Sequence, residues 1–151
     1  MDMNLINEVR KSASKYKELL ESPCTEEKLA RLHKRSLTEL AIAIPIAYAN
    51  FLKIMDGLDF NGMSLYASEQ TKSSDTSQAN IFGFVETNLL HRDVDVMNKY
   101  LVFGGDSMDI YIFDISKNEY QILDRVSLDS LKTFSSFDEM IEFSMRKHIL
   151  K

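Results

Sequence analysis

Three short β-type runs between residues 100 and 123 constrain the fold more than any other feature of the sequence. The runs are Tyr100–Phe103, Asp109–Asp114 and Tyr120–Leu123. Gly104-Gly105 separates the first two, and Ser116-Lys117-Asn118 separates the last two. Connections this short join antiparallel neighbours, and parallel strands would need a much longer crossover. In the second run aliphatic and aromatic side chains alternate, so we expect both faces of the sheet to be covered. The pattern predicts an antiparallel meander.

The first part of the chain has helical periodicity instead. One predicted helical face contains Leu5, Ile6, Val9, Ala13, Tyr16, Leu19 and Leu20. Ser22-Pro23 interrupts this helix, and Thr25 is a suitable N-cap for the next one because Glu26 and Glu27 then occupy its first turn. Leu29, Leu32 and Leu40 continue the apolar stripe.

Pro45 marks the start of a further helix, which we expect from Pro45 to Asp56. A proline disfavours helical geometry at the residue before it and suits the first helical position. The predicted buried face contains Tyr48, Phe51, Leu52 and Met55. Gly57 can then supply a left-handed C-terminal cap.

Asn61-Gly62 is a strong signal for a two-residue hairpin between Leu58–Phe60 and Met63–Tyr66. The stretch from Ala67 to Asn80 contains no large apolar residue, so we expect an exposed, mobile loop there, most clearly from Ser68 to Gln78.

The rest of the chain predicts three more elements. Ile81–Val85 is expected to form a short strand and Thr87–Met97 a short helix. A closing helix follows Ser136, which has capping-box spacing with Glu139. Its predicted inner face contains Phe137, Met140, Ile141, Ser144, Met145 and His148.

Helices, then strands, then a helix predict an α+β fold with a mainly antiparallel sheet and helices packed around it. A chain of 151 residues suits one domain, which we expect to span residues 1–151. One cysteine allows no internal disulfide, and the start of the chain does not resemble a signal peptide. The longest apolar run, Leu40–Ala49, is too short to cross a bilayer. We therefore expect a cytoplasmic protein.

The negative charge is concentrated in the middle of the chain. Asp56 to Asp124 contains twelve acidic and four basic residues, a local charge of −8, whereas the flanks carry +3. Such a stretch disfavours nucleic-acid binding because phosphates are repelled. It suits a basic protein partner, although acidic residues can also simply keep a surface hydrated.

No motif predicts a catalytic, cofactor or metal site. The glycines of Gly57–Gly62 have P-loop spacing, but the essential lysine is missing. The aspartates at 106, 109 and 114 match no EF-hand loop. The three histidines are far apart in sequence. Cys24 has only Lys28 nearby in sequence, and no base or oxyanion site that would make it a nucleophile is evident.

The segment Pro45-Ile46-Ala47-Tyr48-Ala49-Asn50-Phe51-Leu52-Lys53-Ile54-Met55-Asp56-Gly57 resembles the signature of the SUKH superfamily. Thr25-Glu26-Glu27, the stretch from Leu58 to Tyr66, and the runs Tyr100–Gly105 and Asp109–Asp114 are similar to that family too, and the YrhA-like branch is the nearest in character. The chain departs from the family pattern at Asp56, where asparagine is usual, at His33, where glutamate is common, and at Ile44, where leucine is usual.

The resemblance implies a protein-binding immunity protein that neutralises a cognate bacterial toxin, often a nuclease, by stoichiometric binding and without a cofactor. One alternative is a regulatory or scaffold domain with an endogenous partner and no catalysis. Another is a small enzyme or ligand-binding domain, which would have a deep polar pocket. We expect the partner contacts on turns and strands around one face, with Asp106 and Asp109 exposed. The candidate contact residues are Asp56, Asp59, Asn61, Tyr66, Asp106, Asp109, Tyr111 and Asp114.

Overall fold

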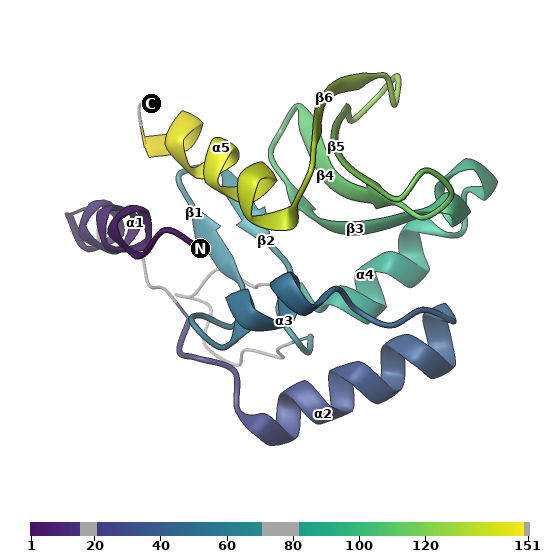
Figure 1. Cartoon of the computed structure of the whole chain (residues 1–151), viewed down its shortest axis with the longest axis horizontal. Coiled ribbons are helices and arrows are strands. Elements are labelled where there is room, and N and C mark those ends of the chain that lie inside the picture. The colour runs from purple at the N-terminus through teal and green to yellow at the C-terminus, as the bar shows by residue number, and fades with distance from the viewer. Residues whose placement is uncertain (16–20, 71–81, 150–151) are drawn as a thin grey trace.

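The computed structural model describes residues 1–15, 21–70 and 82–149, and in it a six-stranded sheet is surrounded by helices (Figure 1). The strand order is β1-β2-β3-β4-β5-β6, and every neighbouring pair is antiparallel. The strands are β1 (Leu58–Phe60), β2 (Met63–Leu65), β3 (Tyr100–Gly105), β4 (Asp109–Asp114), β5 (Glu119–Asp124) and β6 (Ser130–Phe134). The predicted α+β class and the meander are confirmed.

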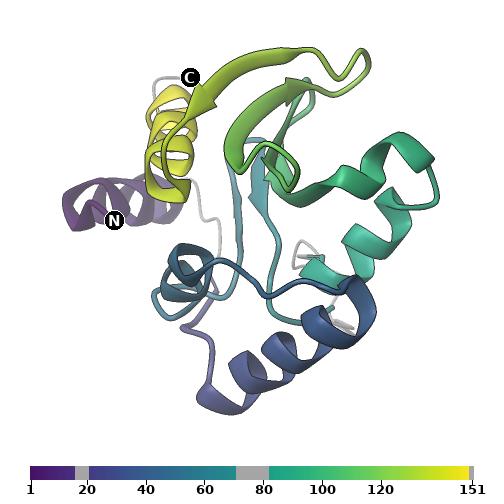
Figure 2. The ribbon, with the colours of Figure 1, turned by 45° about the vertical axis from the view of Figure 1, so that its right-hand side comes forward.

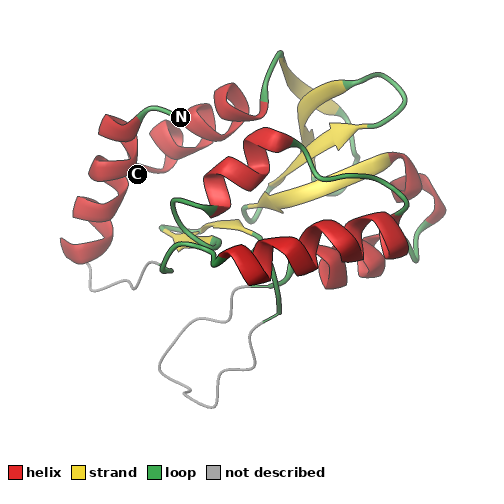
Figure 3. Ribbon diagram, turned by 60° about the horizontal axis from the view of Figure 1, so that its bottom comes forward, coloured by secondary structure: helices red, strands yellow, loops and turns green. Residues whose placement is uncertain are grey.

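The α-helices of the described residues are α1 (Met3–Lys15), α2 (Glu26–Arg35), α3 (Ile46–Leu52), α4 (Phe84–His91) and α5 (Phe137–Ile149). A π-helical segment, η1 (Ser36–Leu40), extends α2, and a 3-10 helix, η2 (Asp95–Lys99), precedes β3. Figure 2 shows α1 beside α5 on one side of the molecule and α4 on the other, with strands between them. Figure 3 shows the same arrangement with helices in red around the yellow strands.

The predicted helix starts are confirmed where a side chain can cap them. The hydroxyl of Thr25 accepts a hydrogen bond from the Lys28 N–H at 3.2 Å, and that of Ser136 accepts one from the Glu139 N–H at 3.2 Å. The carboxylate of Glu139 does not complete a capping box at Ser136. It accepts hydrogen bonds from the N–H and hydroxyl of Ser135 instead.

Helix α3 ends at Leu52, so the predicted extension to Asp56 is wrong. The Leu52 carbonyl, which would accept from Asp56 in a continuing helix, accepts from the Cys24 N–H at 2.8 Å. The Asp56 N–H in turn donates to the carbonyl of Ser22 at 2.9 Å. The segment before α2 therefore uses the backbone groups that a longer helix would need. Gly57 does adopt a left-handed φ of 93°, but after this irregular segment.

Two glycines make close backbone geometry possible in the sheet. Asn61 and Gly62 have φ values of 48° and 87°, as the predicted two-residue hairpin requires. Gly104 pairs with Leu65 beside a register shift in β3. A Cβ at Gly104 would lie 2.0 Å from the carbonyl oxygen of Ser64, so only glycine lets β3 approach β2 this closely.

Several expectations between residues 67 and 97 are wrong. Ala67 and Ser68 are buried, because the N–H and hydroxyl of Ser68 both donate to the carboxylate of Asp56. Glu69 is half-buried and Gln70 is exposed. The remainder of the predicted loop, at 71–80, lies outside the described residues. Residues 84–85 begin α4 and do not form a strand, and Ile81 is not described. The predicted helix Thr87–Met97 is divided between α4 and η2.

The core is centred on Tyr48, which is fully buried as predicted. Its ring centroid lies 5.0 Å from that of Phe84, 5.2 Å from Phe103 and 5.7 Å from Phe137. Its hydroxyl donates to the carbonyl of Tyr66 at 2.7 Å, so the buried polar atom has a partner. Phe51, Leu52 and Met55 are also buried, which confirms the predicted buried face, although Met55 lies beyond the end of α3.

Candidate functional site

Two turns are in contact at one end of the sheet, where a polar cluster lies beside α5 and an apolar groove lies beside α4. The turn between β3 and β4, residues 106–108, is bonded to the turn between β5 and β6, residues 125–129. The Arg125 N–H donates to the Met108 carbonyl at 2.8 Å. The Arg125 guanidinium donates to the Asp106 carbonyl from Nε at 3.0 Å and from Nη2 at 2.7 Å. Polar groups from α5 adjoin this junction, and so does an apolar groove beside α4.

The polar side, which we call the Asp106 cluster, consists of Asp106, Asp109, Tyr111, Lys147 and His148. Oδ1 of Asp106 accepts hydrogen bonds from the N–H groups of Met108 at 2.9 Å and Asp109 at 2.8 Å. Its Oδ2 accepts from the Tyr111 hydroxyl at 3.3 Å and lies 3.2 Å from Nε2 of His148. The carboxylate thus fixes the β3–β4 turn and connects it to α5.

His148 is fully buried in this cluster and ties the end of α5 to two turns. Its Nδ1 lies 2.7 Å from the Ser144 carbonyl. Its Nε2 is within ion-pair distance of Asp106 but is not aligned for a hydrogen bond. Its carbonyl accepts from Nδ2 of Asn61 at 2.5 Å, and neighbouring Lys147 lies 3.3 Å from the Asp109 carboxylate. Because both His148 and Tyr111 are buried, the cluster offers a substrate no exposed acid–base pair.

The pKa of Asp106 lies below its ordinary value of 3.8. Burial by itself raises the pKa of this carboxyl group. Hydrogen bonds from the backbone of Met108 and Asp109, with His148 and Lys147 nearby, outweigh that effect. Asp114 has a lowered pKa in the same way, since hydrogen bonds from Ser116 and Lys117 outweigh its burial.

Replacing Asp106 by asparagine is expected to make the stability of the protein less sensitive to acid. A carboxylate with a lowered folded-state pKa stabilises the fold above the unfolded pKa, and that contribution is lost as pH falls through the folded value. The pH range over which this stabilising contribution is lost therefore begins near the ordinary pKa of 3.8 and extends below it. Thermal melting followed by circular dichroism from about pH 6 to pH 2 measures this. Parallel curves for Asp106→Asn and the native protein below pH 4 would contradict the assignment.

The structure brings together four of the eight predicted contact residues. Asn61, Asp106, Asp109 and Tyr111 all adjoin the end of α5. The expectation that the aspartates are exposed is wrong, because only 6% of the Asp106 side chain and 12% of the Asp109 side chain are accessible. Both are drawn inward by their partners on α5. That these residues contact a partner stays a prediction.

The other four predicted residues lie elsewhere, so the eight do not form one face. Asp114 is at the opposite end of β4 from Asp109, where its Oδ1 accepts from Ser116 and Lys117 in the β4–β5 turn. Asp56 holds Ser68. Asp59 is half-buried, and burial raises its pKa. Tyr66 is buried against the sheet, with its hydroxyl 3.3 Å from Nε2 of His91.

The apolar side of the junction is a groove of about 450 Å³, which we call the α4 groove. It is lined by residues from α4, η2, β4 and the β5–β6 turn. Ile110 is a buried member of this lining, whereas Leu90, Val94 and Val126 are 70%, 57% and 92% exposed. Met108, joined to Arg125, is a further exposed apolar residue at this end. Exposed apolar residues gathered around one groove are typical of an interaction site.

Sequence reasoning missed the α4 groove. The adjacent leucines at 89 and 90 gave no clear signal, because neighbouring helical positions can both be buried, as Phe51 and Leu52 are. Both leucines are exposed.

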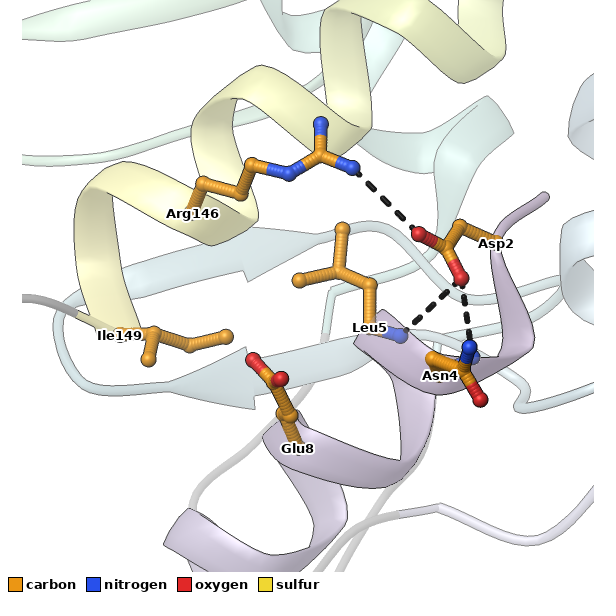
Figure 4. Close-up of a pocket in the computed structure, with 6 residues that line it drawn as sticks. All are labelled: Asp2, Asn4, Leu5, Glu8, Arg146 and Ile149. Atoms are coloured by element: carbon orange, nitrogen blue, oxygen red, sulfur yellow. Dashed lines mark hydrogen bonds and ion pairs between the residues drawn. The ribbon is translucent and has the colours of Figure 1, made fainter.

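A second cavity, of about 280 Å³, lies between α1 and α5 (Figure 4). Asp2 accepts hydrogen bonds there from the N–H groups of Asn4 at 2.9 Å and Leu5 at 3.4 Å. Its other oxygen lies 3.4 Å from Nη2 of Arg146. Glu8 and Ile149 complete the lining. Because Asp2 caps α1 and pairs with α5, these contacts join the two helices, and the lining residues that the structure describes include no histidine, serine or cysteine.

Other groups with potential chemistry are not arranged as a reactive site within the part of the chain that the structure describes. Burial raises the pKa of the Cys24 thiol, which disfavours the reactive thiolate. Among residues 1–15, 21–70 and 82–149, no group of three or more His, Cys, Asp or Glu side chains could hold a metal ion. No helix in these ranges has the length and apolar character needed to cross a membrane.

No protein-family model matches the sequence, and no curated protein matches it.

Proposed function

We propose that this chain is a protein-binding immunity protein that neutralises a cognate bacterial toxin by stoichiometric binding in the cytoplasm. The observation that carries the proposal is the α4 groove with its exposed apolar rim of Leu90, Val94 and Val126. Large apolar side chains exposed together cost solvation free energy unless another surface covers them. The sequence resemblance to SUKH immunity proteins supports a toxin as that partner.

A catalytic function has less support from the side-chain arrangement. Among the described residues, His148 and Asp106 lie within ion-pair distance, but His148 is fully buried. A general base must reach the proton that it removes from a substrate. In the α1–α5 cavity, Asp2 and Arg146 are engaged in holding two helices together.

Affinity capture on the full-length chain, followed by co-expression, tests the proposal. We expect a toxin-domain protein to be retained in a one-to-one complex, and we expect co-expression of this chain to restore growth of cells that produce the toxin. A nuclease would fit the proposal best, because its nucleic-acid-binding surface is basic. A retained partner that is not toxic alone would favour the regulatory or scaffold alternative. A toxin that stays active when bound would contradict the immunity role.

A further inference from the structure

We propose that the α4 groove receives a basic amphipathic segment of the partner protein, with apolar side chains in the groove and lysine or arginine side chains beside its flanking carboxylates. This inference rests on the proposed protein-binding function and adds the site and the chemistry of the ligand.

The apolar part of the inference comes from the shape and exposure of the groove. Ile110 from the central strand β4 and Met97 from η2 are buried members of the lining. Leu90 and Val94 stand on the helical side, and Val126 stands on the opposite turn. Apolar side chains entering between the two sides would remove all three from water. The volume of about 450 Å³ lies within the usual range for ligand clefts, about 300–1,000 Å³.

The charged part comes from carboxylates on both sides. Asp93 and Asp95 are exposed and directly flank Val94. On the opposite turn, Asp124 accepts hydrogen bonds from the N–H groups of Val126 and Ser127, both at 2.9 Å, which fixes its carboxylate beside the rim. Asp129 is exposed and follows Leu128, another lining residue.

The two potentially basic groups in the lining do not cancel the negative charge of these carboxylates. The guanidinium of Arg125 keeps its positive charge, because it donates to the neutral Asp106 carbonyl, but the four carboxylates outnumber this one cation. Burial, with Arg125 nearby, lowers the pKa of His91 below 6.5, so its imidazole is uncharged at neutral pH. The four carboxylates therefore favour a cationic ligand and repel nucleic acid and anionic lipid surfaces. A second copy of this chain would bring the same carboxylates to the interface.

NMR with a defined peptide tests the inference. The probe is a short synthetic peptide in which leucine and lysine repeat with helical periodicity, and the matched control peptide has glutamate in place of lysine. On the full-length ¹⁵N-labelled chain, we expect the lysine peptide to shift amide signals within residues 87–97, 108–110 and 125–128. The glutamate peptide should leave them unchanged.

Variants separate the two parts of the ligand chemistry. Asp93→Asn and Asp95→Asn should each weaken binding of the lysine peptide by about two- to fivefold at low salt. Val94→Ser combined with Val126→Ser should weaken it by about tenfold or more. The matched controls are Glu27→Gln on α2 and Met3→Ser on α1, both at exposed positions outside the groove lining, and neither should change the affinity.

The inference is overturned if the lysine peptide causes no shifts, if its shifts map elsewhere, or if both peptides bind equally. A concentration-dependent dimer with these same residues in its interface would also overturn it, because the groove would then be filled by a second copy. The proposed function can fail separately. If a captured toxin binds the Val94→Ser/Val126→Ser variant normally, the groove is not its binding site, but the proposed immunity role is unaffected. If the lysine peptide binds in the groove but no toxin partner is found, the ligand chemistry of the groove is supported and the immunity role is not.

Discussion

Replacing Phe51 by alanine is expected to lower the free energy of unfolding by about 3–5 kcal/mol. Phe51 is buried in α3, and its ring centroid lies 6.4 Å from that of Phe137 in α5. Truncation would remove apolar contacts and leave a cavity where α3 packs on α5. Urea unfolding followed by circular dichroism is the suitable measurement, because the chain has no tryptophan to provide a fluorescence signal.

The same helix supplies a matched control for this substitution. Ile46, in the first turn of α3, is 79% exposed, so Ile46→Ala should change stability by about 0.5 kcal/mol or less. Equal effects at the two positions would show that helix propensity dominates and that Phe51 packing does not.

Replacing Asp106 by lysine is expected to lower the free energy of unfolding by about 3–5 kcal/mol, which is the scale for leaving a buried charge without a partner. The new ammonium group would lie close to His148 and Lys147. The N–H groups of Met108 and Asp109 would also lose their acceptor. The measurement is again the midpoint and slope of urea unfolding.

Asp95→Lys is the control for this reversal, because Asp95 is exposed on η2. It should leave the unfolding midpoint nearly unchanged. If Asp106→Lys were equally harmless, the Asp106 cluster would not stabilise the turn. Its carboxylate would then be available for the partner contact that the sequence analysis predicts.

Local signals in the sequence predicted those elements whose cause is itself local. Thr25 caps α2 through its own hydroxyl, and Asn61-Gly62 adopts the left-handed geometry that its residue types favour. The segment after Gly83 has strand-like residues but forms α4, because tertiary contacts override propensity. The side-chain amide of Asn88 forms two hydrogen bonds with the backbone of Val102. Its Nδ2 donates to the Val102 carbonyl at 2.8 Å, and its Oδ1 accepts from the Val102 N–H at 2.8 Å.

Strand β6 was missed for a different reason. Four of its five residues are exposed, so it lacks the alternation between apolar and polar residues that identifies a half-buried strand. Its backbone pairing with β5 holds it in the sheet.

The candidate site depends on burial and proximity, which sequence patterns do not specify. Asp106 and His148 are far apart in sequence, and only the docking of α5 against the β3–β4 turn makes them neighbours. The polar spacing of the turn suggested exposed aspartates, whereas the folded chain uses them internally. The α4 groove was missed because hydrophobic periodicity identifies residues that face a core, and Val126 in a turn has no such pattern.

The strand order of the sheet has a consequence for the entropy of folding. Short turns close every neighbouring pair except β2 and β3, which are joined through residues 66–99. Each doubling of a loop adds about 0.6 kcal/mol to its closure, so this connection costs about 2 kcal/mol more than the turns do. Gly104 lies in that pairing, where a Cβ would collide with Ser64. The strand pair that is entropically most expensive to close thus also has no room for a side chain at position 104.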